Sequence, residues 1–156
     1  MKYIRESTQE DIEKMDKEIS VNLYNLYYSH FIGEASWSGL ASSDGGWGRK
    51  YMTIINEAGE NIGLVQMSRK IPRNVAYLAF VIYEKYSNNG YGTKAIYDVI
   101  KLCSSIGINN IILNTTSRRL VNYYENIGFE VVGCIKNRIC LPDGSINNQY
   151  ILQKII

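Results

Sequence analysis

The turn within the stretch YSNNGYGTKA, residues 86–95, has residue types and a spacing that suit phosphate binding. Gly90 and Gly92 lack a Cβ, so the backbone can approach a ligand closely at both positions. The turn leads from an apolar run, residues 75–83, into a segment of helical character, residues 93–105. Backbone N–H groups and the positive end of a helix dipole meet at such a turn and favour an anion. The sequence therefore predicts either a pyrophosphate site or an ordinary turn, and the glycine spacing alone leaves both open.

Two other nucleotide-binding motifs do not fit this turn. Residues 90–95 read GYGTKA, which matches the dinucleotide fingerprint G-x-G-x-x-G/A as text. That fold needs an acidic residue about 20 positions further on to bind ribose. No acid occurs between Asp98 and Glu125, and the chain has no Gly-Lys-Ser/Thr segment of a Walker A loop. Neither a dinucleotide-binding fold nor a P-loop is therefore expected.

A second group with useful chemistry is the phenol of Tyr124, within TSRRLVNYYENIGF, residues 116–129. A tyrosine hydroxyl can donate a proton to a leaving group. Leu120, Tyr124 and Ile127 also share one face of the expected helix, which is the pattern of a core tyrosine. Tyr124 is therefore a candidate general acid or a packing residue, whereas Tyr123 is expected to pack or to face solvent.

The composition is that of an ordinary globular chain. Its 156 residues are enough for one domain, residues 1–156, and too few for two. The net charge of +2 gives no basic field for nucleic acid, and no run approaches the ~20 apolar residues of a membrane helix. Three cysteines without a CxxC pair and a single histidine, His30, argue against a metal site. We therefore expect a cytoplasmic protein without metal, nucleic acid or membrane partners, in which Cys103 and Cys134 are buried as small apolar residues.

Hydrophobic periodicity predicts the elements that must position these groups. Ser7 is the expected N-cap of the first helix, and Glu10 completes a capping box. A helix between strands 75–83 and 108–114 implies that these two strands are parallel. The order βααβββαβαββ predicts an α/β domain around a mixed sheet. The expected strands are residues 2–6, 50–56, 61–69, 75–83, 108–114, 129–139 and 146–156, and the expected helices are 7–20, 21–31, 92–107 and 116–129.

Two motifs in this chain resemble those of the GNAT superfamily of acyl-CoA-dependent N-acyltransferases. The family's pyrophosphate loop, Q/R-x-x-G-x-G/A, is matched by residues 87–92, SNNGYG. A second signature, N-x-R-x-x-x-x-Y-E-x-x-G-F, is matched by residues 117–129, SRRLVNYYENIGF. One helix and one strand separate the motifs, and the resemblance in element order covers nearly the whole chain. It implies a GNAT-like fold with splayed central strands and an N-acetyltransferase that uses acetyl-CoA.

The resemblance also implies where acetyl-CoA would bind. Strand 75–83 would splay from strand 108–114, and the pantetheine arm would lie in the gap against main-chain groups. Tyr124 would stand near the CoA sulfur and protonate the leaving thiolate. The implied cofactor-binding residues are Phe80, Val81, Ile82, Ser87, Asn88, Asn89, Gly90, Tyr91, Gly92, Thr93, Ser117 and Tyr124.

Three positions depart from the family pattern. Ser87 replaces Gln or Arg, which removes one side-chain donor or charge near the phosphates. Ser117 replaces Asn, so one hydrogen bond to pantetheine is either missing or mediated by water. Tyr77 occupies the position at which many relatives carry a glutamate as general base. The base therefore stays open among water molecules and four polar side chains, namely His30, Glu34, Asp44 and Glu84.

The segment IGEASWSGLASSDGGWG, residues 32–48, is the expected wall for the acceptor. A loop this long in a compact domain is usually functional. Trp37 and Trp47 either pack on an apolar or cationic substrate or anchor the loop, and Glu34 suits a cationic amine. We expect direct attack on acetyl-CoA by a primary amine of a small molecule or peptide, in a monomer or homodimer. The alternative is a protein that binds acyl-CoA as a sensor without catalysing transfer.

Overall fold

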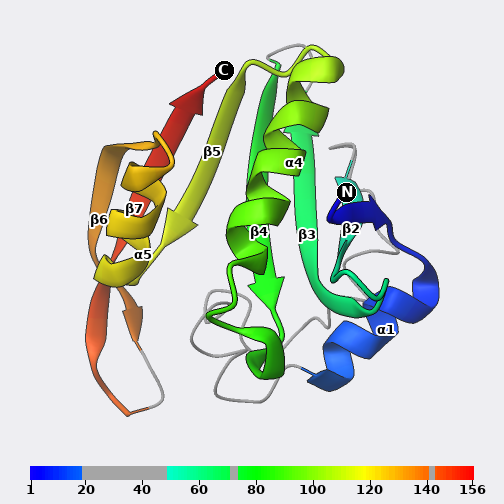
Figure 1. The fold of residues 1–156 in the computed structure, drawn as a ribbon. Helices are drawn as coiled ribbons and strands as arrows, with labels where there is room; N and C mark the ends of the chain where they lie inside the picture. Colours follow the sequence, from blue (N-terminus) through cyan, green and yellow to red (C-terminus); the bar gives the residue numbers. More distant parts are fainter. Residues whose placement is uncertain (19–48, 71–73, 141–142) are drawn as a thin grey trace.

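The computed structural model describes residues 1–18, 49–70, 74–140 and 143–156 (Figure 1). All seven predicted strands are present within two residues of their expected ends. The predicted helix 21–31 and the acceptor segment 32–48 lie outside the described residues. The elements are β1 (Ile4–Glu6), α1 (Gln9–Glu18), β2 (Arg49–Ile55), β3 (Asn61–Lys70), β4 (Val75–Ile82), the 3₁₀ turn η2 (Glu84–Tyr86), α4 (Tyr91–Ser105), β5 (Asn110–Thr115), α5 (Arg118–Asn126), β6 (Glu130–Cys140) and β7 (Ile146–Ile155).

The described strands form one sheet in the order β1-β2-β3-β4-β5-β7-β6. β4 and β5 run parallel, and the other neighbouring pairs are antiparallel. The predicted mixed sheet is thereby confirmed. In Figure 1, α4 and α5 lie side by side over one face of this sheet, α4 in front of β4 and α5 in front of the β6–β7 pair.

Helices cover both faces of β4, because side chains alternate along a strand. Leu78 is buried in one core together with Val99 of α4. Val81 points the other way and is buried with Ile12 of α1. α4 therefore covers one face of β4 and α1 covers the other.

The parallel pair β4–β5 opens partway along its length. Its register runs from Val75 opposite Asn110 to Leu78 opposite Leu113, and ends there. Beyond that point β4 continues to pair with β3 as far as Ile82, and β5 continues to pair with β7 as far as Thr115. Each strand follows its antiparallel partner, so the sheet opens into a V, as Figure 1 shows for the lower half of β4 and β5. This is the splay that the sequence resemblance implied.

The N-terminal cap of α1 differs from the sequence prediction by one residue. The hydroxyl of Thr8 accepts a hydrogen bond from the Asp11 amide at 3.2 Å, and the Asp11 carboxylate accepts one from the Thr8 amide at 2.9 Å. These reciprocal bonds form the capping box. The predicted cap, Ser7, instead shares a hydrogen bond of 2.8 Å with the hydroxyl of Thr53 on β2. The prediction was wrong because the contact of Ser7 with β2 decides which hydroxyl is available.

The cysteines also differ from one another. Cys103 is fully buried in the core, where burial raises the pKa of its thiol to about 11. Cys134 is exposed on β6, contrary to the prediction that it would be buried. β6 is an edge strand on which Ile139 is buried and most other residues, Cys134 among them, are exposed.

Asp11 links α1 to the sheet, and we expect Asp11→Asn to lower the free energy of unfolding by about 1 kcal/mol at pH 7. Both Asp11 oxygens accept hydrogen bonds from the Arg5 guanidinium, at 2.6 and 2.9 Å, and one also accepts from the Asn61 amide at 3.0 Å. The Arg5 contact holds the pKa of the Asp11 carboxyl well below its usual value. Chemical denaturation of the wild type and the variant at several pH values measures the difference.

The pH dependence of this difference follows from the lowered pKa. A carboxylate with a depressed folded-state pKa stabilises the protein fully above its unfolded pKa of ~3.9, and this contribution is lost as the pH falls further. The gap between wild type and Asp11→Asn should therefore be constant near neutrality and shrink below about pH 4. Glu13→Gln, on the exposed face of the same helix, is the matched control and should change stability little. A gap that widens in acid would contradict the assignment.

Candidate active site

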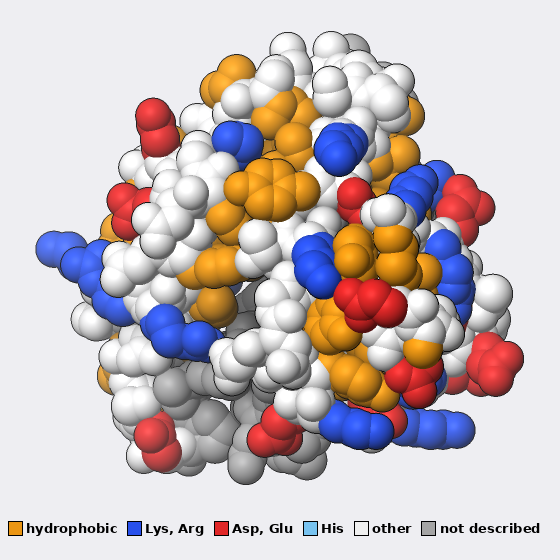
Figure 2. All heavy atoms as spheres, viewed as in Figure 1, with side chains coloured by type: hydrophobic (Ala, Val, Ile, Leu, Met, Phe, Trp, Pro, Cys, Tyr) orange, Lys and Arg blue, Asp and Glu red, His pale blue; other side chains and the backbone are white. Residues whose placement is uncertain are grey.

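A cavity of about 240 Å³ occupies the open side of β4, between β4, α4 and α5. β4 supplies one wall, the turn after β4 and the first turn of α4 close one end, and α5 forms the opposite wall. Figure 2 shows this face of the molecule, where hydrophobic side chains gather between α4 and α5. The lining residues are Phe80, Val81, Ile82, Tyr86, Ser87, Asn88, Gly90, Tyr91, Gly92, Thr93, Ile96, Arg119, Leu120, Tyr123 and Tyr124.

The glycine turn has the geometry of an anion site. Asn88 and Gly90 have positive φ angles, 61° and 79°, and Gly90 is the N-cap of α4. No side chain caps this helix start. The first N–H groups of a helix have no intrahelical acceptor, so those of Tyr91, Gly92 and Thr93 are available at the end of the cavity. Together with the helix dipole they favour a phosphate at this position.

Ten of the twelve residues predicted to bind the cofactor line this cavity, and Asn89 and Ser117 do not. The side-chain amide of Asn89 donates to the carbonyls of Tyr86 and Ser87, at 3.3 and 3.1 Å, so it stabilises the turn from within. Ser117 is the N-cap of α5, where its hydroxyl accepts a hydrogen bond from the Leu120 amide at 3.4 Å.

The cationic side chains nearest the turn have different roles. Lys94 lies in the first turn of α4 but contacts Glu57 of the β2–β3 turn, with Nζ 3.0 Å from Oε1. Tyr91 donates to the other oxygen of Glu57 at 2.8 Å, and these two contacts, that of Tyr91 above all, lower the pKa of Glu57 to about 2. Among the described residues, Arg119 is the cationic side chain that lines the cavity. It belongs to the second sequence motif but was not among the predicted site residues.

Two adjacent tyrosines of α5 face the cavity. The Tyr124 ring packs edge-on against Phe129, with centroids 5.6 Å apart, and against Tyr123, with centroids 5.1 Å apart. The Tyr123 hydroxyl is 2.9 Å from the Thr93 hydroxyl, within hydrogen-bonding distance. Tyr123 was expected only to pack or to face solvent. Its spacing of three residues from Leu120, beside the spacing of four for Tyr124, was a signal that both tyrosines share the inner face.

A second cavity, of about 430 Å³, adjoins the first across the opening between β4 and β5. The two cavities share Phe80, Arg119, Leu120 and Tyr124. The Tyr124 side chain, which carries the candidate hydroxyl, therefore borders both cavities. The remaining lining residues of the second cavity are Gln66, Ser68, Tyr77, Leu78, Ala79, Ile112, Leu113, Asn114, Thr115, Thr116, Ser117, Ile139 and Gln149.

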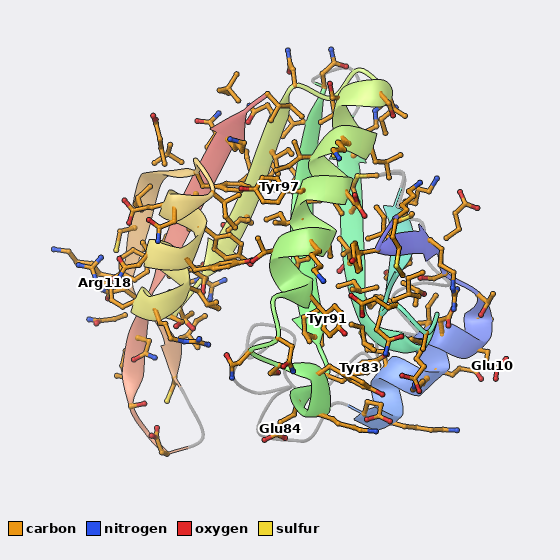
Figure 3. All side chains as sticks on the ribbon, in the orientation of Figure 1. Glu10, Tyr83, Glu84, Tyr91, Tyr97 and Arg118 are labelled. Carbon is orange, nitrogen blue, oxygen red and sulfur yellow. The ribbon has the colours of Figure 1, made fainter. Side chains whose placement is uncertain are left out.

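The second cavity carries mainly neutral hydrogen-bonding groups. Tyr77, which replaces the family's glutamate, is 42% exposed and lies opposite Ser68 in the β3–β4 pair. No carboxylate occurs among the described lining residues. Glu84, one of the candidate bases, is exposed on η2, lines neither described cavity and points away from α4 in Figure 3. The described residues therefore do not supply a general base at this cavity.

Several predicted residues cannot be placed, because they lie outside the described residues. They are His30, Glu34, Trp37, Asp44 and Trp47. Within residues 1–18, 49–70, 74–140 and 143–156, no cluster of three or more His, Cys, Asp or Glu side chains is arranged to hold a metal ion. In the same part of the chain, no helix has the length and apolar character needed to cross a membrane.

Two joined cavities that meet at an opening in the sheet suit a transfer between two substrates, one with an anionic group at the start of α4. The sequence profile of the acetyltransferase (GNAT) family matches residues 17–129, which is most of the chain. The chain therefore belongs to the GNAT family of acetyltransferases, as the two sequence motifs indicated.

Solved structures of this fold support the architecture. The spermidine N-acetyltransferase of Vibrio cholerae, in complex with CoA and spermine, has a TM-score of 0.82 at 14% identity, over 97% of this chain and 94% of that one. A phosphinothricin acetyltransferase of Sinorhizobium meliloti with acetyl-CoA has a TM-score of 0.76 at 17% identity, over 100% and 89%. The ribosomal-protein-alanine N-acetyltransferase of Brucella melitensis has a TM-score of 0.71 at 18% identity, over 98% and 99%. No curated protein sequence shows significant similarity to the chain.

Proposed function

We propose that the protein transfers an acetyl group from acetyl-CoA to a primary amine of a small molecule or peptide. The observation that carries this proposal is the position of Tyr124, which borders two cavities that join where β4 and β5 separate. A donor in the first cavity and an acceptor in the second would meet beside this hydroxyl. Tyr124 is then the general acid.

The first cavity is assigned to acetyl-CoA. Its pyrophosphate would accept hydrogen bonds from the first-turn amides of α4, beside Gly90 and Gly92, where no side chain caps the helix. The pantetheine arm would lie along residues 79–82, whose side facing β5 has no strand partner in the part of the chain that the structure describes. A buried backbone edge without a partner is costly, and an amide-rich ligand arm satisfies it. Phe80 and Ile82 would make these main-chain contacts, whereas the main-chain groups of Val81, also predicted to do so, face Leu64 of β3.

Position 87, which is Gln or Arg in the family pattern, is Ser in this chain, and Arg119 is a candidate to take over its role. The Ser87 hydroxyl donates to the Tyr83 carbonyl at 3.4 Å, so it is engaged within the turn. Arg119 lines both cavities from the first turn of α5. A guanidinium is always charged and binds phosphate well. We assign to Arg119 part of the anion binding that a Gln or Arg at position 87 provides in the family pattern.

The reaction is a direct displacement. A primary amine has a pKa near ~10 and must lose a proton before it attacks. Its nitrogen then forms the C–N bond while the C–S bond breaks and the electron pair of that bond passes to sulfur. Tyr124 gives the sulfur a proton and regains one from solvent. The nitrogen gives up one proton before it attacks and a second one once the C–N bond has formed. These protons go to water or to His30, Glu34 or Asp44, of which the last two lie within the acceptor segment, residues 32–48.

The Val81 amide belongs to a residue paired with Leu64 of β3, so it is not free to donate to the carbonyl oxygen. The Phe80 or Ile82 amide on the open side of β4 takes that role in the proposal.

The second cavity is assigned to the acceptor. Its described wall combines apolar side chains with neutral polar ones, among them Gln66, Asn114 and Gln149. We propose that Glu34, Trp37 and Trp47 complete this wall. The enzymes whose solved structures are named above are acetyltransferases for spermidine, phosphinothricin and ribosomal-protein alanine. The acceptors of this fold therefore range from polyamines to peptides. We further propose that residues 1–156 are a single cytoplasmic domain that acts as a monomer or homodimer.

The function is tested by an acceptor screen that follows release of the free CoA thiol. The panel contains a polyamine, a free amino acid, an aminophosphinate and a short peptide with an N-terminal alanine, each with acetyl-CoA at a fixed concentration. At least one amine should give saturable turnover above the rate of acetyl-CoA hydrolysis without amine. Binding of acetyl-CoA is measured in parallel by calorimetry.

The two readouts separate the alternatives. Acetyl-CoA binding without turnover on any amine would favour the sensor. Absence of acetyl-CoA binding in the folded protein would remove the assignment of the first cavity altogether.

A further inference from the structure

The Tyr123 hydroxyl joins two walls of the first cavity. It reaches from α5 to the hydroxyl of Thr93 in the first turn of α4, at 2.9 Å. The two residues are 30 positions apart in sequence, and β5 and the rest of α4 lie between them. This hydrogen bond links the anion-binding end of the cavity to the helix that carries Tyr124.

The surroundings of this hydroxyl keep it protonated. The Tyr123 side chain is half-buried, and burial raises the pKa of its phenol above the usual value. A Cβ at Gly92 would stand 3.6 Å from the Tyr123 oxygen, which is an ordinary van der Waals distance. The hydroxyl therefore lies next to the backbone of the turn that would hold the pyrophosphate.

The ring of Tyr123 has a second contact. It packs edge-on against the ring of Tyr124, with centroids 5.1 Å apart and planes at 65°. Phe129 supports Tyr124 on another side, with centroids 5.6 Å apart. A shift of the Tyr123 ring would therefore move the candidate acid, whereas loss of the Tyr123 hydroxyl alone would leave this packing in place.

We propose that Tyr123 is a positioning residue, whose hydroxyl orients the phosphate-binding turn and whose ring orients Tyr124. This inference rests on the proposed function, because it assumes that acetyl-CoA occupies the first cavity. A ligand held at both ends depends on the spacing between its two anchoring points. Misplacement of a reacting group by about 1 Å is enough to slow an enzyme markedly.

Two substitutions and two acetyl donors separate these roles. Tyr123→Phe removes the hydroxyl and keeps the ring, and Tyr123→Leu removes both. The donors are acetyl-CoA and S-acetylpantetheine, which has the same thioester and lacks the pyrophosphate and nucleotide. Tyr123→Phe should raise KM for acetyl-CoA about fivefold, the size expected of one net hydrogen bond, and leave kcat/KM for S-acetylpantetheine unchanged. Tyr123→Leu should in addition lower kcat with both donors.

A double-mutant cycle with Thr93→Val tests the hydrogen bond itself. Valine keeps the shape of threonine without its hydroxyl, so the variant Tyr123→Phe/Thr93→Val should bind acetyl-CoA no more weakly than Thr93→Val alone. Additive losses would show that the two hydroxyls act separately and would overturn the inference. Equal losses of kcat/KM with both donors in Tyr123→Phe would overturn it as well.

The matched control is Tyr97→Phe on α4. Tyr97 is 48% exposed, lines neither described cavity and lies between α4 and α5 in Figure 3. This variant should keep the wild-type KM for both donors, and thermal unfolding of all variants checks that they fold. Measurements on the wild-type protein distinguish a failure of the proposed function from a failure of the role of Tyr123. If it neither binds nor uses acetyl-CoA, the proposed function fails. If it does both and Tyr123→Phe behaves as wild type, only the role of Tyr123 fails.

Discussion

Tyr124→Phe is expected to lower kcat for acetyl transfer by about 10²–10⁴-fold, the usual contribution of general acid catalysis. The departing CoA thiolate gains negative charge only as the C–S bond breaks, so a proton donor matters most in the transition state. The dissociation constant of acetyl-CoA should therefore change little. Single-turnover kinetics with the best amine of the panel measures the chemical step directly and excludes product release as the limiting event.

Phenylalanine keeps the packing that holds residue 124 in place. The contacts of residue 124 with Tyr123 and Phe129 are made by its ring, which phenylalanine retains, so the fold of α5 should persist. Tyr97→Phe, which removes an exposed hydroxyl on α4, is the control for a general effect of losing a phenol. A Tyr124→Phe enzyme with the wild-type single-turnover rate would return Tyr124 to a packing role and leave the thiolate without an assigned acid.

Gly90→Val should weaken acetyl-CoA binding at least tenfold, about 1.4 kcal/mol. Gly90 has a φ of 79° at the N-cap of α4, and a β-branched residue strains the backbone there. The added side chain has no protein atom within 4 Å of its Cβ, so it would project into open space at the turn assigned to the pyrophosphate. Calorimetric titration with acetyl-CoA gives the dissociation constant.

Gly107→Val is a closely matched control at the other end of α4. Gly107 also has a φ of 79°, and its Cβ would likewise meet nothing within 4 Å. The two substitutions should therefore cost similar stability, while Gly107→Val leaves acetyl-CoA affinity unchanged. Gly92→Val is a second variant, since its branched side chain would start 3.6 Å from the Tyr123 oxygen. Equal affinity in the Gly90 and Gly107 variants would remove the turn from the cofactor site.

The sequence by itself determined the elements and the place of the turn. Apolar residues at helical and strand periods predicted each described strand within two residues, and both α4 and α5. The glycines at 90 and 92, followed by a helix, located the candidate anion site, and the resemblance of residues 117–129 to the second GNAT signature placed Tyr124 beside the cofactor. These features are local, because a period, a positive φ and a helix start depend on neighbouring residues.

Only the tertiary structure decided the contacts between distant segments. Ser7 lost the cap of α1 to Thr8 because Thr53, 46 positions away, engages its hydroxyl. Tyr123 entered the cavity wall because the packing of α5 beside α4 brings its hydroxyl to Thr93. Arg119 borders both cavities, and Tyr77 lines the second one, because the sheet opens where β4 and β5 follow different antiparallel partners. The positions of Tyr123, Arg119 and Tyr77 depend on how whole helices and strands pack. A local sequence pattern does not encode the distances between such elements.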